Sequence, residues 1–131
     1  MIALDSSAII SILRLEPDAK SLLRAVVAAR GRLMSAFSVL ETSLVLAGQK
    51  GGAAVWHPLN EFLAEAAVEV IAFDIDQATH ARNAFMIYGK GRHPAALNLG
   101  DCASYALAKS RNIPLLFKGD DFTRTDITSA L

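Results

Sequence analysis

Short apolar segments that resemble buried strands alternate with longer segments of helical periodicity along the whole sequence. The first strand segment, Met1–Leu4, stops abruptly at Asp5, and the last clear one is Ile113–Phe117. Strands that are joined through helices run parallel, with right-handed crossovers. The alternation therefore predicts an α/β fold in which helices sandwich a parallel sheet of four to five strands. Ligands gather outside the carboxyl ends of such strands.

Apolar periodicity and breaking residues place the remaining elements. Two further strands are expected at Leu33–Met34 and Val68–Phe73. Glycines at Gly48 and in Lys50–Gly52 interrupt a long helical stretch, so the helices on either side should form a protruding hairpin. The expected helices are Ala8–Leu15, Pro17–Arg30, a helix from the Ser35 cap to Ala47, Ala53–Ala67, Gln77–Tyr88 with Asp74 and Gln77 as a capping box, and Leu99–Arg111 with Asn98 as its cap. These elements form one domain over residues 1–131.

Composition excludes several classes of protein. With 131 residues, 53% of them hydrophobic, the chain can bury a core without disulfides or structural metal. Thirteen Lys and Arg balance thirteen Asp and Glu, so any contact with nucleic acid must come from a local basic patch. Cys102 is the only cysteine, which excludes a disulfide framework and a zinc site with two thiolates. The sequence contains no leader pattern and no apolar run near the ~20 residues of a membrane span, so we expect a soluble, cytoplasmic protein.

Five acidic residues lie where the predicted fold converges. Asp5 follows the first strand, Glu41 lies two turns into the helix after the second, and Asp101 is in the first turn of the helix before the last strand. Asp120 and Asp121 follow that last strand. Clustered carboxylates repel one another unless a cation lies among them. Mg²⁺ and Mn²⁺ prefer such oxygen ligands and retain waters, so the pattern predicts a divalent metal site that activates water against a phosphodiester.

Most of these acids also have ordinary structural explanations. Asp5 can cap the first helix, Asp101 can be a first-turn acid favoured by the helix dipole, and Asp120 and Asp121 can be turn residues. Glu41 is harder to explain locally, because it interrupts an apolar helix face and no Lys or Arg lies three or four residues away. The local sequence leaves both interpretations open for the other acids.

Four ordered segments carry a resemblance to a known family. They are Ile2–Ala8, Glu41 after its Ser-capped helix start, Asn98–Ala106 and Leu115–Phe122. Together they resemble the PIN-domain ribonucleases, and most closely the VapC toxins of bacterial toxin–antitoxin pairs, from end to end of the chain. The resemblance implies a Mg²⁺- or Mn²⁺-dependent endoribonuclease toxin that cuts structured RNA such as tRNA or rRNA. It also implies a homodimer that is silenced by a cognate VapB antitoxin.

The family's site residues transfer to matching positions of this sequence. Its first acid falls on Asp5, its second on Glu41 and its third on Asp101, and the resemblance makes Asp5 and Asp101 the principal metal ligands. Ser6 matches a small polar position that supports the first acid. Together with a fourth acid, these side chains should form the catalytic and metal-binding set.

The position of the fourth acid departs from the family pattern. Many relatives have a Ser or Thr after the last strand and an acid two residues beyond it, but Phe117 and Gly119 occupy those places here. The role therefore passes to Asp121 or to Asp120. Glu41 or the fourth acid would order the attacking water or a second ion.

RNA binding requires positive charge beside the acids. The loop containing Lys90, Arg92 and His93 precedes Asp101 closely enough to overhang the site, although it can also be a solvated linker. Lys118 could serve the same purpose. The partly apolar hairpin suggests an interface for self-association or for an antitoxin helix.

Two other functions compete with the ribonuclease interpretation. A phosphorylatable receiver-like signalling domain also gathers acids and a Lys at strand ends, and Asp5, Asp74 and Lys118 could take those roles. That interpretation leaves Glu41 and Asp101 unexplained. A catalytically inactive PIN-fold binding module is the other alternative, and the presence of an acid at each family position argues against it.

Overall fold

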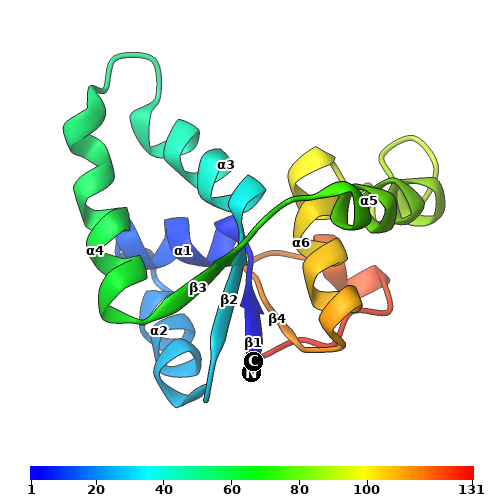
Figure 1. The fold of residues 1–131 in the computed structure, drawn as a ribbon, viewed down its shortest axis with the longest axis horizontal. Helices are drawn as coiled ribbons and strands as arrows, with labels where there is room; N and C mark the ends of the chain where they lie inside the picture. Colours follow the sequence, from blue (N-terminus) through cyan, green and yellow to red (C-terminus); the bar gives the residue numbers. More distant parts are fainter.

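The computed structural model describes residues 1–131 and contains one parallel sheet of four strands in the order β3-β2-β1-β4 (Figure 1). The strands are β1 (Ile2–Leu4), β2 (Arg32–Ser35), β3 (Val68–Ile71) and β4 (Leu115–Leu116). All three neighbouring pairs run parallel. The predicted α/β architecture is confirmed, with four strands.

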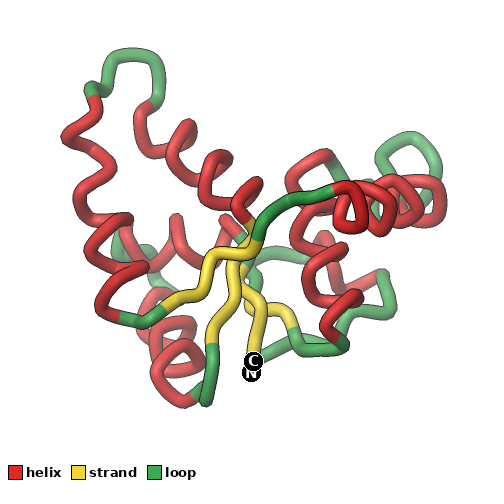
Figure 2. Tube along the Cα trace, viewed as in Figure 1, coloured by secondary structure: helices red, strands yellow, loops and turns green.

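Six α-helices surround the sheet, and Figure 2 shows them on both of its sides. They are α1 (Ser6–Leu13), α2 (Ala19–Ala28), α3 (Ala36–Ala47), α4 (His57–Glu65), α5 (Ile75–Tyr88) and α6 (Leu99–Arg111). Two short 3₁₀ helices, η1 (Ala53–Trp56) and η2 (Asp121–Arg124), complete the fold. No helix combines the length and the apolar character that a membrane span requires.

The two faces of the sheet bury separate apolar cores, because successive side chains of a strand point to opposite faces. Ala3 and Leu115 face the core shared with α5 and α6. Leu4 and Leu116 face the core shared with α1, α2 and α4. The strands β1 and β4 are therefore apolar throughout their short lengths, and their carboxyl ends lie between the two helical layers.

The helices α3 and α4 form the predicted protruding hairpin (Figure 1). The indole Nε1 of Trp56 donates to the Ser43 carbonyl at 2.8 Å and ties its two arms together. The second arm is not one continuous helix over Ala53–Ala67 as predicted, but the 3₁₀ turn η1 followed by α4. Pro58 explains the break, because proline is favoured in the first turn of a new helix and cannot continue an existing one.

Two other predictions were wrong in detail. The last strand is shorter than Ile113–Phe117, since Pro114 has no N–H to donate to the ladder. Asp74 does cap α5 and accepts from the Gln77 N–H at 3.0 Å. However, the Gln77 amide does not complete a capping box, because its Nε2 donates to the Ser110 hydroxyl at 2.8 Å. Contact with a distant helix has displaced the local arrangement that the spacing predicted.

Candidate active site

Acidic side chains from four separate segments meet at the carboxyl edge of the sheet. Asp5 follows β1, Glu41 lies in α3, Asp101 is in the first turn of α6, and Asp121 begins η2. The charges of Asp5, Asp121 and Glu41 all contribute to raising the pKa of Asp101. The fold therefore brings together the four acids that the sequence singled out.

Asp5 is the most deeply placed of these acids, with 3% of its surface exposed. It caps α1, and its Oδ2 accepts from the Ser7 N–H at 3.1 Å and from the Ser7 hydroxyl at 2.5 Å. Its Oδ1 accepts from the Ser104 hydroxyl at 2.5 Å. Burial raises the pKa of Asp5, and these hydrogen bonds oppose that effect. The cap and the site acid are thus the same residue, and no Lys or Arg neutralises it.

Glu41 is fixed by a hydroxyl and by a glycine. Its Oε1 accepts from the Ser6 hydroxyl at 2.6 Å, and its carboxylate lies against Gly100, where any Cβ atom would overlap it. Burial raises the pKa of Glu41, and the charge of Asp5 adds to that shift. Ser6 therefore supports the first acid through its backbone, as predicted, and its hydroxyl supports the second. The first turn of α1 directs Ser6 toward α3, while Ser7 turns back to Asp5.

Asp101 combines a structural role with a place in the cluster. Its Oδ2 accepts from the Asn98 N–H at 3.0 Å, while Asn98 Oδ1 accepts from the Asp101 N–H at 2.9 Å, so the two residues form a capping box. Burial is the largest influence on the pKa of this carboxyl group and raises it. The hydrogen bond from the Asn98 N–H opposes that shift, the repulsion of the neighbouring acids adds to it, and the resulting pKa is about 7. This carboxyl group is therefore protonated in a large share of the molecules near neutral pH unless a cation stabilises the charge.

The fourth acid is better placed at Asp121 than at Asp120. The charge of Asp121 is among the main influences that raise the pKa of Asp101, and that of Asp120 is not. The adjacent Phe122 is buried and packs against Phe117, with ring centroids 5.1 Å apart. This anchor fixes the short helix η2 beside the acidic edge.

The donor chemistry of the cluster fits a hard divalent cation. Its polar atoms are carboxylate and hydroxyl oxygens, and none of the acids Asp5, Glu41, Asp101 and Asp121 forms an ion pair. No three Asp, Glu, His or Cys side chains close into a ready-made metal cage in this structure. The fit consequently rests on the oxygen donors and on uncompensated negative charge.

The predicted basic residues differ in whether they already form ion pairs. Lys118 is bound by Glu16, and its Nζ lies 3.6 Å from Asp18, so its charge is already neutralised. That pairing makes Lys118 a poor candidate for an RNA contact. Lys90 and Arg92 are exposed and make no ion pair.

The remaining predicted RNA contact, His93, has a structural role in its loop. Its Nδ1 accepts from the Ala95 N–H at 3.0 Å, and its ring packs edge-on against Tyr88 at 5.1 Å between centroids. Arg92 lies over the Phe85 ring at 5.9 Å. Contacts with α5 thus hold the loop in place, and Lys90 and Arg92 are the positive charges of this loop that could bind RNA.

Sequence reasoning missed Gly100, Ser7 and the buried Ser104 as parts of the site. Only Gly100 carried a usable signal, because a glycine inside an otherwise alanine-rich helix is unfavourable by about 1 kcal/mol and needs a reason such as close packing. The two serines resemble ordinary small polar residues in the sequence. Their roles depend on which distant residue each one faces.

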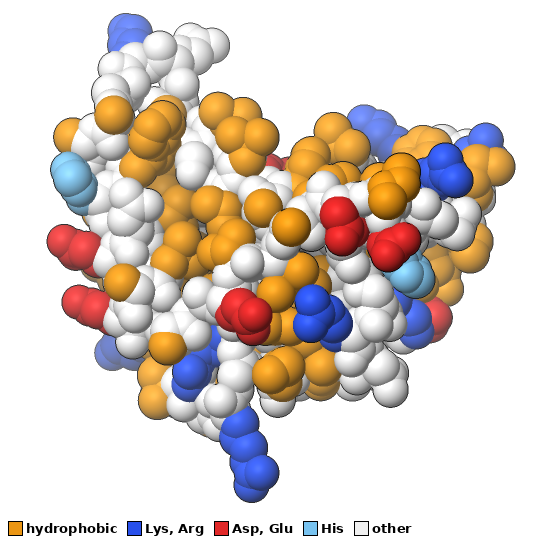
Figure 3. Space-filling view, in the orientation of Figure 1, with side chains coloured by type: hydrophobic (Ala, Val, Ile, Leu, Met, Phe, Trp, Pro, Cys, Tyr) orange, Lys and Arg blue, Asp and Glu red, His pale blue; other side chains and the backbone are white.

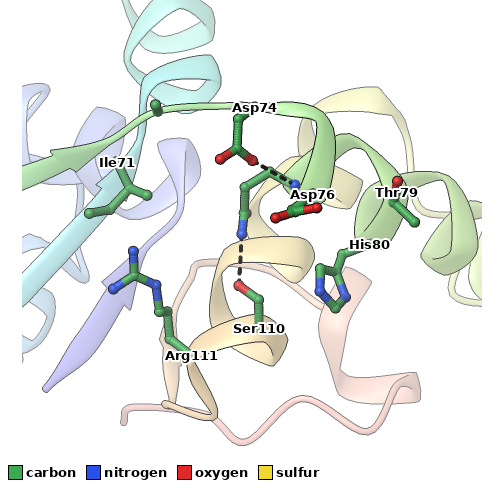
Figure 4. A pocket seen from close by; sticks show the side chains of 9 residues that line it. Ile71, Asp74, Asp76, Thr79, His80, Ser110 and Arg111 are labelled. Atoms are coloured by element: carbon green, nitrogen blue, oxygen red, sulfur yellow. Dashed lines mark hydrogen bonds between the residues drawn. The ribbon is translucent and has the colours of Figure 1, made fainter.

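A separate polar pocket of about 360 Å³ lies between the start of α5 and the end of α6 (Figure 4). Asp76, His80 and Arg111 surround its opening, and the Gln77–Ser110 hydrogen bond crosses it. None of the four clustered acids lines this pocket. The acidic edge and this pocket are therefore separate features of the molecule.

The parallel sheet and its acidic carboxyl edge are those of a PIN domain, and the PIN domain family model matches residues 2–127. Ribonuclease VapC30 of Mycobacterium tuberculosis is 50% identical over 129 residues, which cover 96% of this chain and 95% of that protein. Ribonuclease VapC of Mycolicibacterium smegmatis is 48% identical, with 96% and 97% covered. The chain therefore belongs to the PIN-domain family and, within it, to the VapC-type ribonuclease toxins.

Solved structures agree on the fold. VapC20 of Mycobacterium tuberculosis, described as a sarcin-ricin loop cleaving toxin, has a TM-score of 0.76 at 17% identity, with 98% of this chain and 97% of that one covered. VapBC2 of Rickettsia felis, solved with a DNA fragment from its promoter, has a TM-score of 0.74 at 15% identity, with 98% and 96% covered. At these identities the likeness concerns the fold alone.

Proposed function

We propose that this chain is a Mg²⁺-dependent endoribonuclease, with Mn²⁺ as a substitute, that hydrolyses phosphodiester bonds of structured RNA such as tRNA or rRNA. The observation that carries the proposal is the set of unpaired carboxylates at the sheet edge, where Asp101 has a pKa of about 7. Such a cluster is electrostatically unfavourable without a cation. Membership of the VapC-type ribonucleases supports RNA as the substrate.

The residues that would hold the cation are Asp5, Glu41, Asp101 and Asp121. A divalent cation bound there lowers the pKa of water and stabilises negative charge on the leaving oxygen. Asp5 is oriented on both of its oxygens by hydrogen bonds before any cation arrives. Glu41 or Asp121 would order the attacking water and receive its proton. The exposed Lys90 and Arg92 would bind phosphates of the RNA.

We also propose a VapB-type antitoxin and a second copy of the chain as partners. Structural neighbours include a toxin-antitoxin complex from Klebsiella pneumoniae, which supports the first. An apolar groove between α2 and α4, with Val26, Val27 and Phe62 in its walls, suits an amphipathic antitoxin helix.

Exposed apolar side chains support self-association. On the face in Figure 3 such side chains gather over the hairpin and over α5. Leu40 and Leu44 of α3, and Ile75 and Met86 of α5, each have more than half of their surface exposed. Isolated exposed apolar residues need no explanation, but a contiguous group of them marks an interaction surface. Burial in a homodimer would remove this surface from water.

Incubation of the purified protein with labelled tRNA and rRNA tests the enzymatic proposal. Cleavage should require Mg²⁺ or Mn²⁺ and stop when EDTA is added. Incubation with acetyl phosphate tests the receiver alternative, and phosphorylation without RNA cleavage would favour it. Absence of both activities in a folded sample would favour the inactive binding module.

A further inference from the structure

Ser104 connects the last helix to the first acid of the chain. Its hydroxyl lies 2.5 Å from Asp5 Oδ1, although the two residues are 99 positions apart in the sequence. Ser104 has 1% of its surface exposed, so neither group can replace this bond with one to water. A carboxylate without its proton only accepts hydrogen bonds, and the Ser104 hydroxyl is therefore the donor.

A second buried hydroxyl supports Ser104 from the other side. Ser38 in α3 is fully buried, and its Oγ lies 3.2 Å from Ser104 Oγ. A hydroxyl has a single proton, and that of Ser104 is used on Asp5, so Ser38 donates to Ser104. The result is a relay that passes from α3 through α6 to the acid after β1.

Little else in their surroundings explains why the hydroxyls of Ser38 and Ser104 are buried. The buried face of α6 around Ser104 is made of small apolar residues, Cys102, Ala103 and Ala106 among them. Burying a hydroxyl in such surroundings is unfavourable unless its hydrogen bonds are satisfied. Here the satisfied arrangement ends at Asp5, and the other Asp5 oxygen is bound by Ser7. Donors on both oxygens fix the plane of the carboxylate.

We propose that Ser104, held by Ser38, is a positioning residue that fixes the Asp5 carboxylate so that its remaining lone pairs face the divalent cation. The inference rests on the proposed metal-dependent function. Both serines are buried, so they would act through Asp5 and not on the substrate directly. Outer hydrogen-bond partners of metal ligands orient those ligands, and their loss typically weakens metal binding about 10–100-fold.

An isosteric pair of variants isolates the Ser104 hydroxyl. Ser104→Thr keeps the hydroxyl and Ser104→Val replaces it with a methyl group of the same shape. Mn²⁺ affinity, measured by electron paramagnetic resonance of free Mn²⁺, should be near wild type in S104T and about tenfold weaker in S104V. Raising Mn²⁺ should restore RNA cleavage by S104V, which a general packing defect would not allow. Equal Mn²⁺ affinity in the two variants would overturn the inference.

Two further variants make the result specific. Ser110→Ala removes a hydroxyl of an exposed residue on the same helix, one that accepts from Gln77 and does not bond Asp5, and should leave Mn²⁺ affinity unchanged. Ser38→Ala removes only the donor to Ser104 and should weaken Mn²⁺ binding by a smaller factor, about threefold, since its effect on the ligand is indirect. If neither replacement at Ser104 folds, Ser38→Ala decides, and wild-type affinity in that variant overturns the relay.

The same measurements separate this inference from the function on which it rests. Wild-type protein that binds no Mn²⁺, or Asp5→Asn that binds it as tightly as wild type, would overturn the metal site itself. A wild-type site that loses Mn²⁺ in D5N but keeps it in both S104V and S38A would leave the function standing and remove only the relay.

Discussion

The Glu41 carboxylate lies against Gly100, at the point where α3 meets the first turn of α6. A Cβ atom at position 100 would overlap both carboxylate oxygens, so any other residue there would displace the Glu41 side chain. The contact places the second acid beside Asp101, the next residue of α6. Backbone packing between two helices, and not only the choice of acidic residues, therefore determines the spacing of the site.

Gly100→Ala should displace Glu41 and reduce RNA cleavage at least tenfold, since small misplacements of site groups have large effects on rate. Helix content should be retained, because alanine is favoured in helices by about 1 kcal/mol over glycine. Cleavage rates and circular dichroism measure the two effects. Gly52→Ala is the matched control, since nothing lies within 4 Å of a Cβ at that position. Full activity in G100A would contradict the proposed role of this contact.

Asp5→Asn and Asp101→Asn should each reduce RNA cleavage by at least a hundredfold, because an amide does not supply the negative charge that the cation requires. Both variants should fold, since the Asn side-chain oxygen can still accept the capping hydrogen bonds. Asp76→Asn, at an exposed position of α5, serves as the control and should cleave like wild type. A near-normal cleavage rate in D5N or D101N would remove the metal assignment.

The raised pKa of Asp101 makes stability depend on pH. A carboxyl group with a folded-state pKa of about 7 and an ordinary unfolded-state pKa binds its proton more tightly when folded, so stability falls as pH rises from about 4 to 7. Asp101→Asn removes this loss of stability, because an amide does not titrate in this pH range. Without divalent cations, its free energy of unfolding at pH 8 should exceed that of wild type by about 2–4 kcal/mol, the upper value being the full shift from 3.8 to about 7. Urea unfolding at pH 8 and pH 4 measures this, and a gain that does not shrink at pH 4 would contradict it.

A divalent cation should restore the stability that the wild-type protein loses as pH rises. Binding to the folded state alone stabilises it by about 2.7 kcal/mol when the free cation is at 100 times its Kd. Thermal unfolding at pH 8 should therefore occur several degrees higher with Mn²⁺ than with EDTA. The increase should be much smaller at pH 5, where Asp101 is protonated, and absent in Asp5→Asn. An equal increase in wild type and D5N would indicate binding elsewhere.

The fold and the acids could be predicted because each depends on local features of the sequence. Asp5 stops an apolar strand, and Asn98 precedes a helix with Asp101 at the capping position, so the sequence alone locates both acids. Parallel connectivity then requires the strand ends to share one edge. These two facts together predict that the acids cluster at that edge.

The contacts that fix the acids could not be predicted in the same way. Hydrophobic periodicity indicates which face of a helix is buried, but not which residue of another helix it meets. Ser6 faces Glu41 and Ser104 faces Asp5 because α3 and α6 pack side by side over the start of α1, an arrangement set by the whole core. Gln77 likewise bonds Ser110 rather than closing its own cap. Side-chain partners between helices therefore required the structure.

The loop between α5 and α6 should bind RNA through charge rather than through its histidine. Replacing both Lys90 and Arg92 with Ala should weaken RNA binding and reduce the slope of log affinity against log salt by about 2, one for each lost phosphate contact. Lys118→Ala should change that slope little, because Glu16 already neutralises Lys118. Filter binding at several salt concentrations, with Asp5→Asn in the background to prevent cleavage, measures both slopes. An unchanged slope in the double variant, or a larger change in Lys118→Ala, would assign phosphate binding to another surface.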